Sequence, residues 1–193
     1  MSTVQESPAV RQRRWSKDEF YRLAELGFFQ GQRVELIGGR LMVASPQNPL
    51  HAAALDRVGD TLRRVFGTNW RVRCQVPLDL GPFSEPEPDF SVVVPADYSL
   101  AHPTSAELIV EVSDSTLAYD RAQKGSLYAA SGLREYWIVN LVDRMVEVYR
   151  DPVPDSTQPF GQRYASRTDL VPPASVAPLA LPQASILVAD LLP

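Results

Sequence analysis

Cysteine is nearly absent from this chain of 193 residues, which contains Cys74 alone. A single thiol excludes an intrachain disulfide and a cysteine-rich zinc site. Cys74 lies in a stretch where apolar and polar residues alternate, so we expect it to pack in the core. No glycine-rich phosphate-binding loop is present either, because Gly38-Gly39 has the pattern of a hairpin turn.

Long apolar runs are also missing. No run approaches the roughly 20 apolar residues that cross a bilayer as a helix. The first fifteen residues are polar and basic, which is unlike a signal peptide. These features predict a protein that contacts no membrane and resides in the cytoplasm.

Basic charge is modest, with 19 Lys and Arg against 23 Asp and Glu and a formal net charge of −4. This balance argues against strong non-specific binding of nucleic acid. The charge is uneven, since residues 1–73 hold 12 basic and 7 acidic residues and the remainder holds 7 and 16. Such a division suits a protein that contacts phosphates with one region and binds metal with another, but an unevenly charged solvated surface explains it equally well.

The length predicts one domain, which we place at residues 15–193. Residues 1–14 are predicted to be a disordered basic arm. From about residue 151 a proline-rich segment is expected to wrap the surface, ending in a packed stretch at 184–192.

The expected elements form an α/β domain of the α+β type with a mixed sheet, because the regular βαβ alternation of a doubly wound fold is missing. A capping box at Ser16 and Glu19 predicts the start of a helix. Later elements are read from apolar periodicity and turn residues. They are a hairpin at 33–43, a helix at 50–66, strands at 71–80, 89–94 and 108–113, a helix at 120–130 and a hairpin at 135–150.

Two acidic residues stand beside short apolar runs. Asp89 directly precedes Phe90-Ser91-Val92-Val93-Val94, and Glu111 lies inside Leu108-Ile109-Val110-Glu111-Val112-Ser113. Such runs are typical of buried strands, where an unpaired carboxylate is unfavourable. Carboxylate oxygens on neighbouring strands are the hard ligands that Mg²⁺ or Mn²⁺ prefers.

Glu35 and Lys124 complete a candidate site if the predicted strands are neighbours. A metal held by the carboxylates can polarise a phosphoryl oxygen and activate water, and a lysine can orient that water or stabilise developing charge. Structural explanations stay open: Asp89 can cap a strand, Glu35 can face solvent, and Lys124 can be a surface residue paired with Asp120.

Six segments between about residues 16 and 150 together resemble the Uma2 family of the PD-(D/E)XK nuclease superfamily. They are Val34-Glu35-Leu36-Ile37-Gly38-Gly39-Arg40-Leu41; Ser45-Pro46 with His51; Glu87-Pro88-Asp89-Phe90-Ser91-Val92-Val93; Leu108-Ile109-Val110-Glu111-Val112-Ser113-Asp114-Ser115-Thr116; Asp120-Arg121-Ala122-Gln123-Lys124-Gly125-Ser126-Leu127-Tyr128; and Glu135-Tyr136-Trp137-Ile138-Val139-Asn140.

The resemblance implies a restriction-endonuclease-like core, a small mixed sheet flanked by helices, and Mg²⁺- or Mn²⁺-dependent hydrolysis of nucleic acid, with DNA as the expected substrate. It implies that Asp89, Glu111 and the backbone carbonyl of Val112 bind the metal, with Glu35 as a further candidate ligand. Lys124 would be the catalytic lysine supplied from a helix, because Ser113 stands where the superfamily pattern has lysine. We also expect a homodimer, since a two-fold enzyme matches a two-fold duplex.

Two other classes of function compete with this hypothesis. The first is a catalytically inactive homodimer or nucleic-acid-binding protein that keeps the nuclease fold, which the low basicity and the displaced lysine favour. The second is a glycosidase that uses paired acids, which the short chain and the three tryptophans make a poor match. His51 is expected to be a cap or surface residue rather than a ligand.

Overall fold

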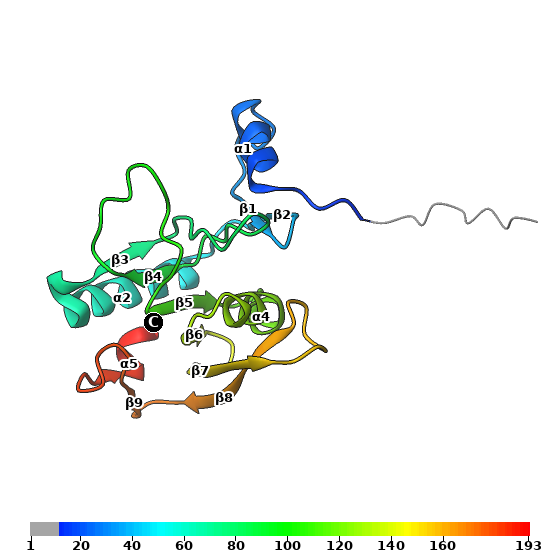
Figure 1. Cartoon of the computed structure of the whole chain (residues 1–193). Coiled ribbons are helices and arrows are strands. Elements are labelled where there is room, and N and C mark those ends of the chain that lie inside the picture. Colours follow the sequence, from blue (N-terminus) through cyan, green and yellow to red (C-terminus); the bar gives the residue numbers. More distant parts are fainter. Residues whose placement is uncertain (1–11) are drawn as a thin grey trace, which may run out of the picture.

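The computed structural model describes residues 12–193. For residues 1–11, the predicted disordered basic arm lies outside the described part of the chain. The centre of the fold is a six-stranded sheet in the order β3-β4-β5-β6-β7-β8 (Figure 1). The β5–β6 pair is parallel and the other neighbours are antiparallel. This arrangement confirms the predicted mixed sheet flanked by helices.

The strands of this sheet are β3 (Arg71–Cys74), β4 (Phe90–Val93), β5 (Leu108–Ser113), β6 (Glu135–Asn140), β7 (Met145–Pro154) and β8 (Gln162–Leu170). Two small antiparallel pairs stand apart from it: β1 (Val34–Ile37) with β2 (Arg40–Val43), and β9 (Ser175–Val176) with β10 (Ile186–Leu187). The helical segments are α1 (Lys17–Glu25), α2 (Pro49–Phe66), η1 (Gly67–Asn69), α3 (Leu117–Tyr119), η2 (Asp120–Lys124), α4 (Gly125–Ala130) and α5 (Val188–Leu191).

The sheet separates two hydrophobic clusters. One face packs against α2 and the C-terminal segment, and its cluster includes Val58, Val110 and Val112. The other face packs against α4, and its cluster includes Ile109 and Tyr128. Because side chains alternate along a strand, β5 directs Val110 and Val112 toward α2 and directs Glu111 toward the face that carries α4.

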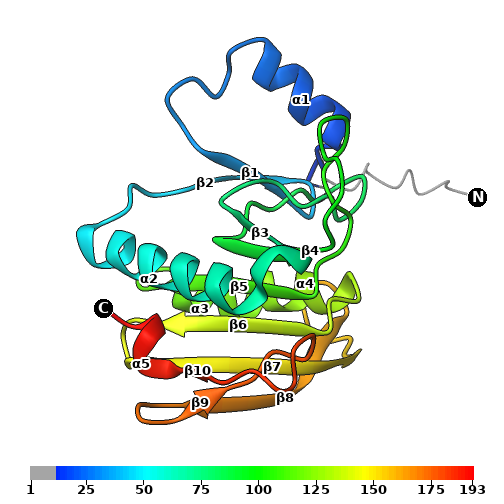
Figure 2. The same ribbon diagram turned by 90° about the vertical axis from the view of Figure 1, so that its left-hand side faces the viewer.

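The β1–β2 hairpin and α1 lie at one end of the molecule, opposite β8 and β9 (Figures 1 and 2). The hairpin turns at Gly38 and Gly39, whose φ angles of 59° and 80° suit residues that have no Cβ. The predicted capping box is present, because the Ser16 hydroxyl accepts from the Glu19 N–H and the Glu19 carboxylate accepts from the Ser16 N–H.

Two expectations about extended segments were wrong in extent. The strand predicted at 71–80 ends at Cys74 because Gln75 adopts a φ of 50°. Cys74 is half-buried and packs against the core. The proline-rich tail does more than wrap the surface, because β7 continues to Pro154 and β8 adds the edge strand of the sheet. The last stretch packs as expected, with Ile186, Val188 and Leu191 buried.

The described residues contain no helix that is both long enough and apolar enough to span a membrane.

Candidate active site

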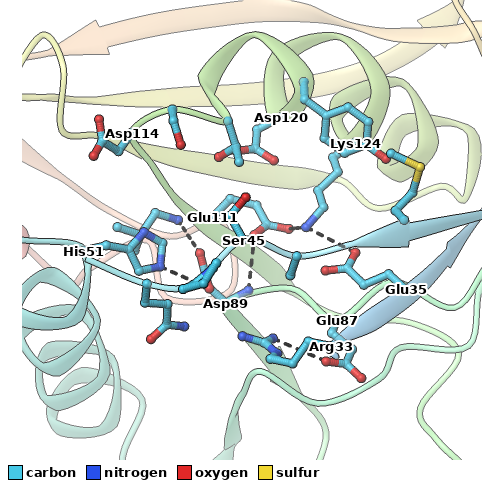
Figure 3. Close-up of a pocket in the computed structure, with 18 of the residues that line it drawn as sticks. Arg33, Glu35, Ser45, His51, Glu87, Asp89, Glu111, Asp114, Asp120 and Lys124 are labelled. Carbon is cyan, nitrogen blue, oxygen red and sulfur yellow. Dashed lines mark hydrogen bonds and ion pairs between the residues drawn. The ribbon is translucent and has the colours of Figure 1, made fainter. Parts of the chain in front are cut away.

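A cavity of about 250 Å³ opens where five segments meet: the β1–β2 hairpin, the start of α2, the loop before β4, the end of β5, and η2. Glu35, Asp89, Glu111 and Lys124 all line this cavity (Figure 3). We call it the carboxylate cavity. The structure thus brings together all four side chains that the sequence singled out.

Asp89 enters the cavity from the residue before β4. Its Oδ2 accepts a hydrogen bond of 2.8 Å from the backbone N–H of Val112, and its Oδ1 accepts one of 3.0 Å from the Gln75 side chain. Its own backbone N–H donates to Glu111 Oε2 at 3.3 Å. Because β4 and β5 are neighbours, these bonds connect the two acids across the strand pair, and Asp89 does not merely begin a strand.

Glu111 is almost fully enclosed, with 3% of the residue exposed. Its Oε1 accepts hydrogen bonds from Lys124 Nζ at 2.9 Å and from the Tyr128 hydroxyl at 2.6 Å. Both donors come from the helical segment that packs on this face of the sheet. Burial raises the pKa of Glu111 to about 8 despite the opposing charge of Lys124, and the charges of Asp89, Asp120 and Glu35 add to the increase.

Lys124 lies between two carboxylates, because its Nζ is also 3.4 Å from Glu35 Oε2 (Figure 3). Burial alone would lower the pKa of Lys124, but the charges of Glu111 and Glu35 raise it well above the usual value. Burial raises the pKa of Glu35, against the opposing effect of Lys124. Glu35 and Lys124 are 9% and 7% exposed, so Glu35 does not face solvent and Lys124 is not a surface lysine.

The backbone that carries Lys124 is a single π-helical turn, in which the Gly125 N–H donates to the Asp120 carbonyl. Such turns are rare and frequently occur at functional sites. Asp120 begins this turn and is buried, and its Oδ2 accepts from the Ser113 and Thr116 hydroxyls at 2.7 and 2.6 Å. Asp120 thus ties η2 to the end of β5 instead of forming the exposed pair with Lys124 considered above.

Asp89 differs from the other acids in its pKa. Burial would raise the pKa of Asp89, but His51, the Gln75 amide and the Val112 N–H together lower it below the usual value. The His51 Nε2 lies 3.8 Å from Asp89 Oδ1, which is an ion-pair distance rather than a hydrogen bond. The pKa of Asp89 is therefore lowered, whereas the pKa values of Glu35, Glu111 and Asp120 are raised.

The sequence did not predict several contacts of the candidate site. The helix cap of α2 is Asn48, whose side chain accepts from the His51 N–H, so His51 is not the cap and its ring instead faces Asp89. Gln75 lay on the polar side of a predicted strand, and that pattern gave no signal of a contact with Asp89. Tyr128 stands one turn beyond Lys124, and that spacing was the signal for its contact with Glu111.

The donor set suits a hard divalent cation, since it consists of carboxylate oxygens from adjacent strands beside a cavity. Within residues 12–193, no three side chains of His, Cys, Asp or Glu stand close enough together to hold a metal ion. Lys124 itself supplies the positive charge between Glu111 and Glu35. The residues fit a metal by chemistry, with Asp89 and Glu111 as the two acids linked to each other.

The family is decided by a sequence comparison, in which the model of the Uma2 family, described as "Putative restriction endonuclease", matches residues 17–186. The chain belongs to the Uma2 family. A solved structure also resembles it: a "putative nuclease belonging to DUF820 from Anabaena variabilis ATCC 29413". That structure aligns with a TM-score of 0.66 and 18% identity, covering 91% of this chain and 96% of the other.

At this identity the likeness shows that the two proteins share a fold. No curated protein matches the chain. Uma2 membership confirms the resemblance drawn from the six segments, and the matched region contains every residue of the candidate site.

Proposed function

We propose that this Uma2 protein is a metal-dependent nuclease that hydrolyses phosphodiester bonds, with DNA as the substrate. The convergence of Asp89, Glu111, Glu35 and Lys124 on one cavity carries the proposal. The family description and the fold neighbour support a nuclease.

Mg²⁺ or Mn²⁺ would be held by Asp89, Glu111 and the backbone carbonyl of Val112, and Glu35 would become a further ligand by moving away from its contact with Lys124. When bound, the metal would polarise a phosphoryl oxygen and lower the pKa of a water molecule. The raised pKa of Glu111 supports this assignment, because a cation beside the carboxylate would favour its ionised form.

Other side chains would hold the two acids in place and stabilise the charge that develops during the reaction. Asp89 is held in its orientation by the Val112 N–H and Gln75, and Tyr128 holds Glu111. Lys124 would stabilise the negative charge that develops on the phosphorus centre or position the attacking water. Its raised pKa keeps the ammonium charged for either role.

Cleavage of plasmid DNA and of a structured RNA by the purified protein tests this proposal, with Mg²⁺, with Mn²⁺ and with a chelator. We expect metal-dependent cleavage of DNA that Glu111→Gln removes. Cleavage of RNA alone would change the substrate, and cleavage that persists in chelator would contradict the mechanism.

The alternative is a catalytically inactive protein of the same fold that forms a homodimer or binds nucleic acid. The contact of Lys124 with both Glu111 and Glu35 favours it, because this ammonium already balances buried negative charge without a metal. Binding of DNA with no turnover under any metal condition would support this alternative. We propose a homodimer in either case, and sedimentation of the full chain would test it.

A further inference from the structure

A second hollow adjoins the carboxylate cavity at the turn of the β1–β2 hairpin. Its walls include Arg14, Arg40, Met42, Tyr119, Gln123 and Phe160, and we call it the arginine hollow. Met42 and Tyr119 also line the carboxylate cavity. The two hollows therefore share a wall, and a ligand that extends past this wall would occupy both.

The arginine hollow is built directly on the backbone of the hairpin turn. A Cβ at Gly38 would lie 2.9 Å from Cε1 of Phe160, and a Cβ at Gly39 would lie 2.7 Å from Cβ of Arg14. Both side chains thus pack against glycine backbone. The loop that carries Phe160 is anchored to α4, because the Phe160 N–H donates to Ser126 Oγ at 3.0 Å.

The charge of the two hollows is opposite. Arg40 is exposed, and neither Arg14 nor Arg40 forms an ion pair with a carboxylate of residues 12–193. Arg14 is oriented by a hydrogen bond of 3.1 Å from its Nε to the Gly38 carbonyl. By contrast, Lys124 in the carboxylate cavity is paired with acids. The arginine hollow therefore offers its positive charge to an anion.

Tyr119 lines both hollows. Its hydroxyl is buried and has no hydrogen-bond partner among the described residues. A buried hydroxyl without a partner is unfavourable, so a ligand acceptor beside Tyr119 would satisfy it. Phe160 is partly exposed and adds an aromatic ring to the wall of the hollow.

We propose that the arginine hollow binds the nucleic-acid strand next to the phosphodiester bond held in the carboxylate cavity. Arg14 and Arg40 contact a neighbouring phosphate, and the ring of Phe160 stacks on a base. Positive charge and an aromatic face are the two features by which proteins bind a strand without reading its sequence. The inference rests on the proposed function only in placing the scissile bond in the carboxylate cavity.

Fluorescence anisotropy of a labelled single-stranded DNA oligonucleotide tests the inference, in Ca²⁺ so that binding is measured apart from cleavage. We expect Arg14→Ala and Arg40→Ala each to weaken binding about fivefold, and each to lower the slope of log K against log salt by about one. Phe160→Ala should weaken binding with little change in that slope. Arg134→Ala is the matched control, because Arg134 is exposed and lines neither hollow.

Thermal unfolding of each variant separates loss of binding from loss of structure, and Arg40→Gln serves if Arg40→Ala does not fold. Unchanged affinity in folded variants at both arginines would overturn the inference, even if the protein cleaves DNA. Displacement of the oligonucleotide by an equal concentration of inorganic phosphate would also overturn it, since the hollow would then be a simple anion site. Arginine-dependent binding without cleavage in Mg²⁺ or Mn²⁺ would support the inference and contradict the proposed nuclease.

Discussion

Two clusters around buried acids lie on this sheet, the carboxylate cavity and the partners of Glu147, and they are balanced in different ways. In the carboxylate cavity, Lys124 is shared between Glu111 and Glu35. On β7, Glu147 accepts from Arg121, Asn140 and Tyr149, at distances of 2.5 to 3.0 Å, and Arg167 lies 3.4 Å away. Glu147 therefore has more cationic partners than either acid of the cavity.

The pKa values express this difference. Burial would raise the pKa of Glu147, but Arg121, Tyr149 and Asn140 lower it below the usual value. Burial raises the pKa of Glu111 to about 8. Glu111 accepts from Lys124, Tyr128 and the Asp89 N–H, but these contacts do not offset its burial, and a buried carboxylate with too little compensating charge is a candidate for binding a ligand. This difference supports the proposed functional role of Glu111 and a structural role for Glu147.

The largest expected effect is on activity. Glu111→Gln should reduce metal-dependent cleavage at least about 100-fold, because the amide is a poor ligand for a hard cation. The free energy of unfolding of the Glu111→Gln protein should be unchanged or increased in metal-free buffer at neutral pH, since burial disfavours the charge of the Glu111 carboxylate. Initial cleavage rates and urea unfolding check both statements. A large loss of stability would place Glu111 in the same class as Glu147.

The second effect is on stability. Glu147→Gln should lower the free energy of unfolding by about 2 kcal/mol, because it removes one partner from a buried charged network. The value is below that for fully enclosed pairs, since the Arg121 and Arg167 side chains are 33% and 38% exposed. Urea unfolding measures it, and cleavage per folded molecule should change little. A stability equal to wild type would remove the contrast between the clusters.

The third prediction concerns stability, whose pH dependence should differ between the contributions of Glu147 and Glu111. The folded-state pKa of Glu147 is lowered, so its contribution to stability is present above the unfolded pKa of about 4.3 and is lost as the pH falls through the folded value. The folded-state pKa of Glu111 is raised to about 8, so its contribution is present below about pH 4.3 and is lost as the pH rises toward 8.

Unfolding by urea over this pH range in metal-free buffer tests both signs. Glu147→Gln should reduce the acid-side loss of stability, and Glu111→Gln should reduce the decline between about pH 4 and 8. The same pH profile for both variants would contradict the account.

The smallest effect concerns Tyr128, which donates to Glu111. Tyr128→Phe should slow cleavage about tenfold, because it frees the carboxylate to rotate. Tyr136→Phe is the matched control, since Tyr136 lies in the same aromatic cluster and donates to the Asp120 carbonyl at 3.3 Å. Equal slowing in both variants would indicate a packing effect.

Much of the carboxylate cavity could be predicted from the sequence, whereas the partners of Glu147 could not. Short runs rich in Val and Ile located β4 and β5, and an acid beside each run located Asp89 and Glu111. Gly38-Gly39 located the hairpin that carries Glu35. These signals are local, so periodicity and turn chemistry were enough to find them.

The remaining features depend on contacts that are distant in the sequence. The π-helical turn at 120–124 follows no periodicity that distinguishes it from an α-helix, so the approach of Lys124 to Glu111 rested on family resemblance. The strand predicted at 71–80 ended early because Gln75 adopts a positive φ, which alternation cannot reveal. The edge strand β8 was hidden in a segment whose prolines argued against strands.

Nicking of supercoiled plasmid by wild type and by Asp89→Asn, purified side by side and assayed in Mg²⁺ and in Mn²⁺, tests the central claim most directly. Asn keeps the size of Asp89 and removes its charge. The account predicts nicking by wild type alone, with both proteins unfolding at similar temperatures. Equal nicking by the two folded proteins would contradict the assignment of the carboxylate cavity as the active site.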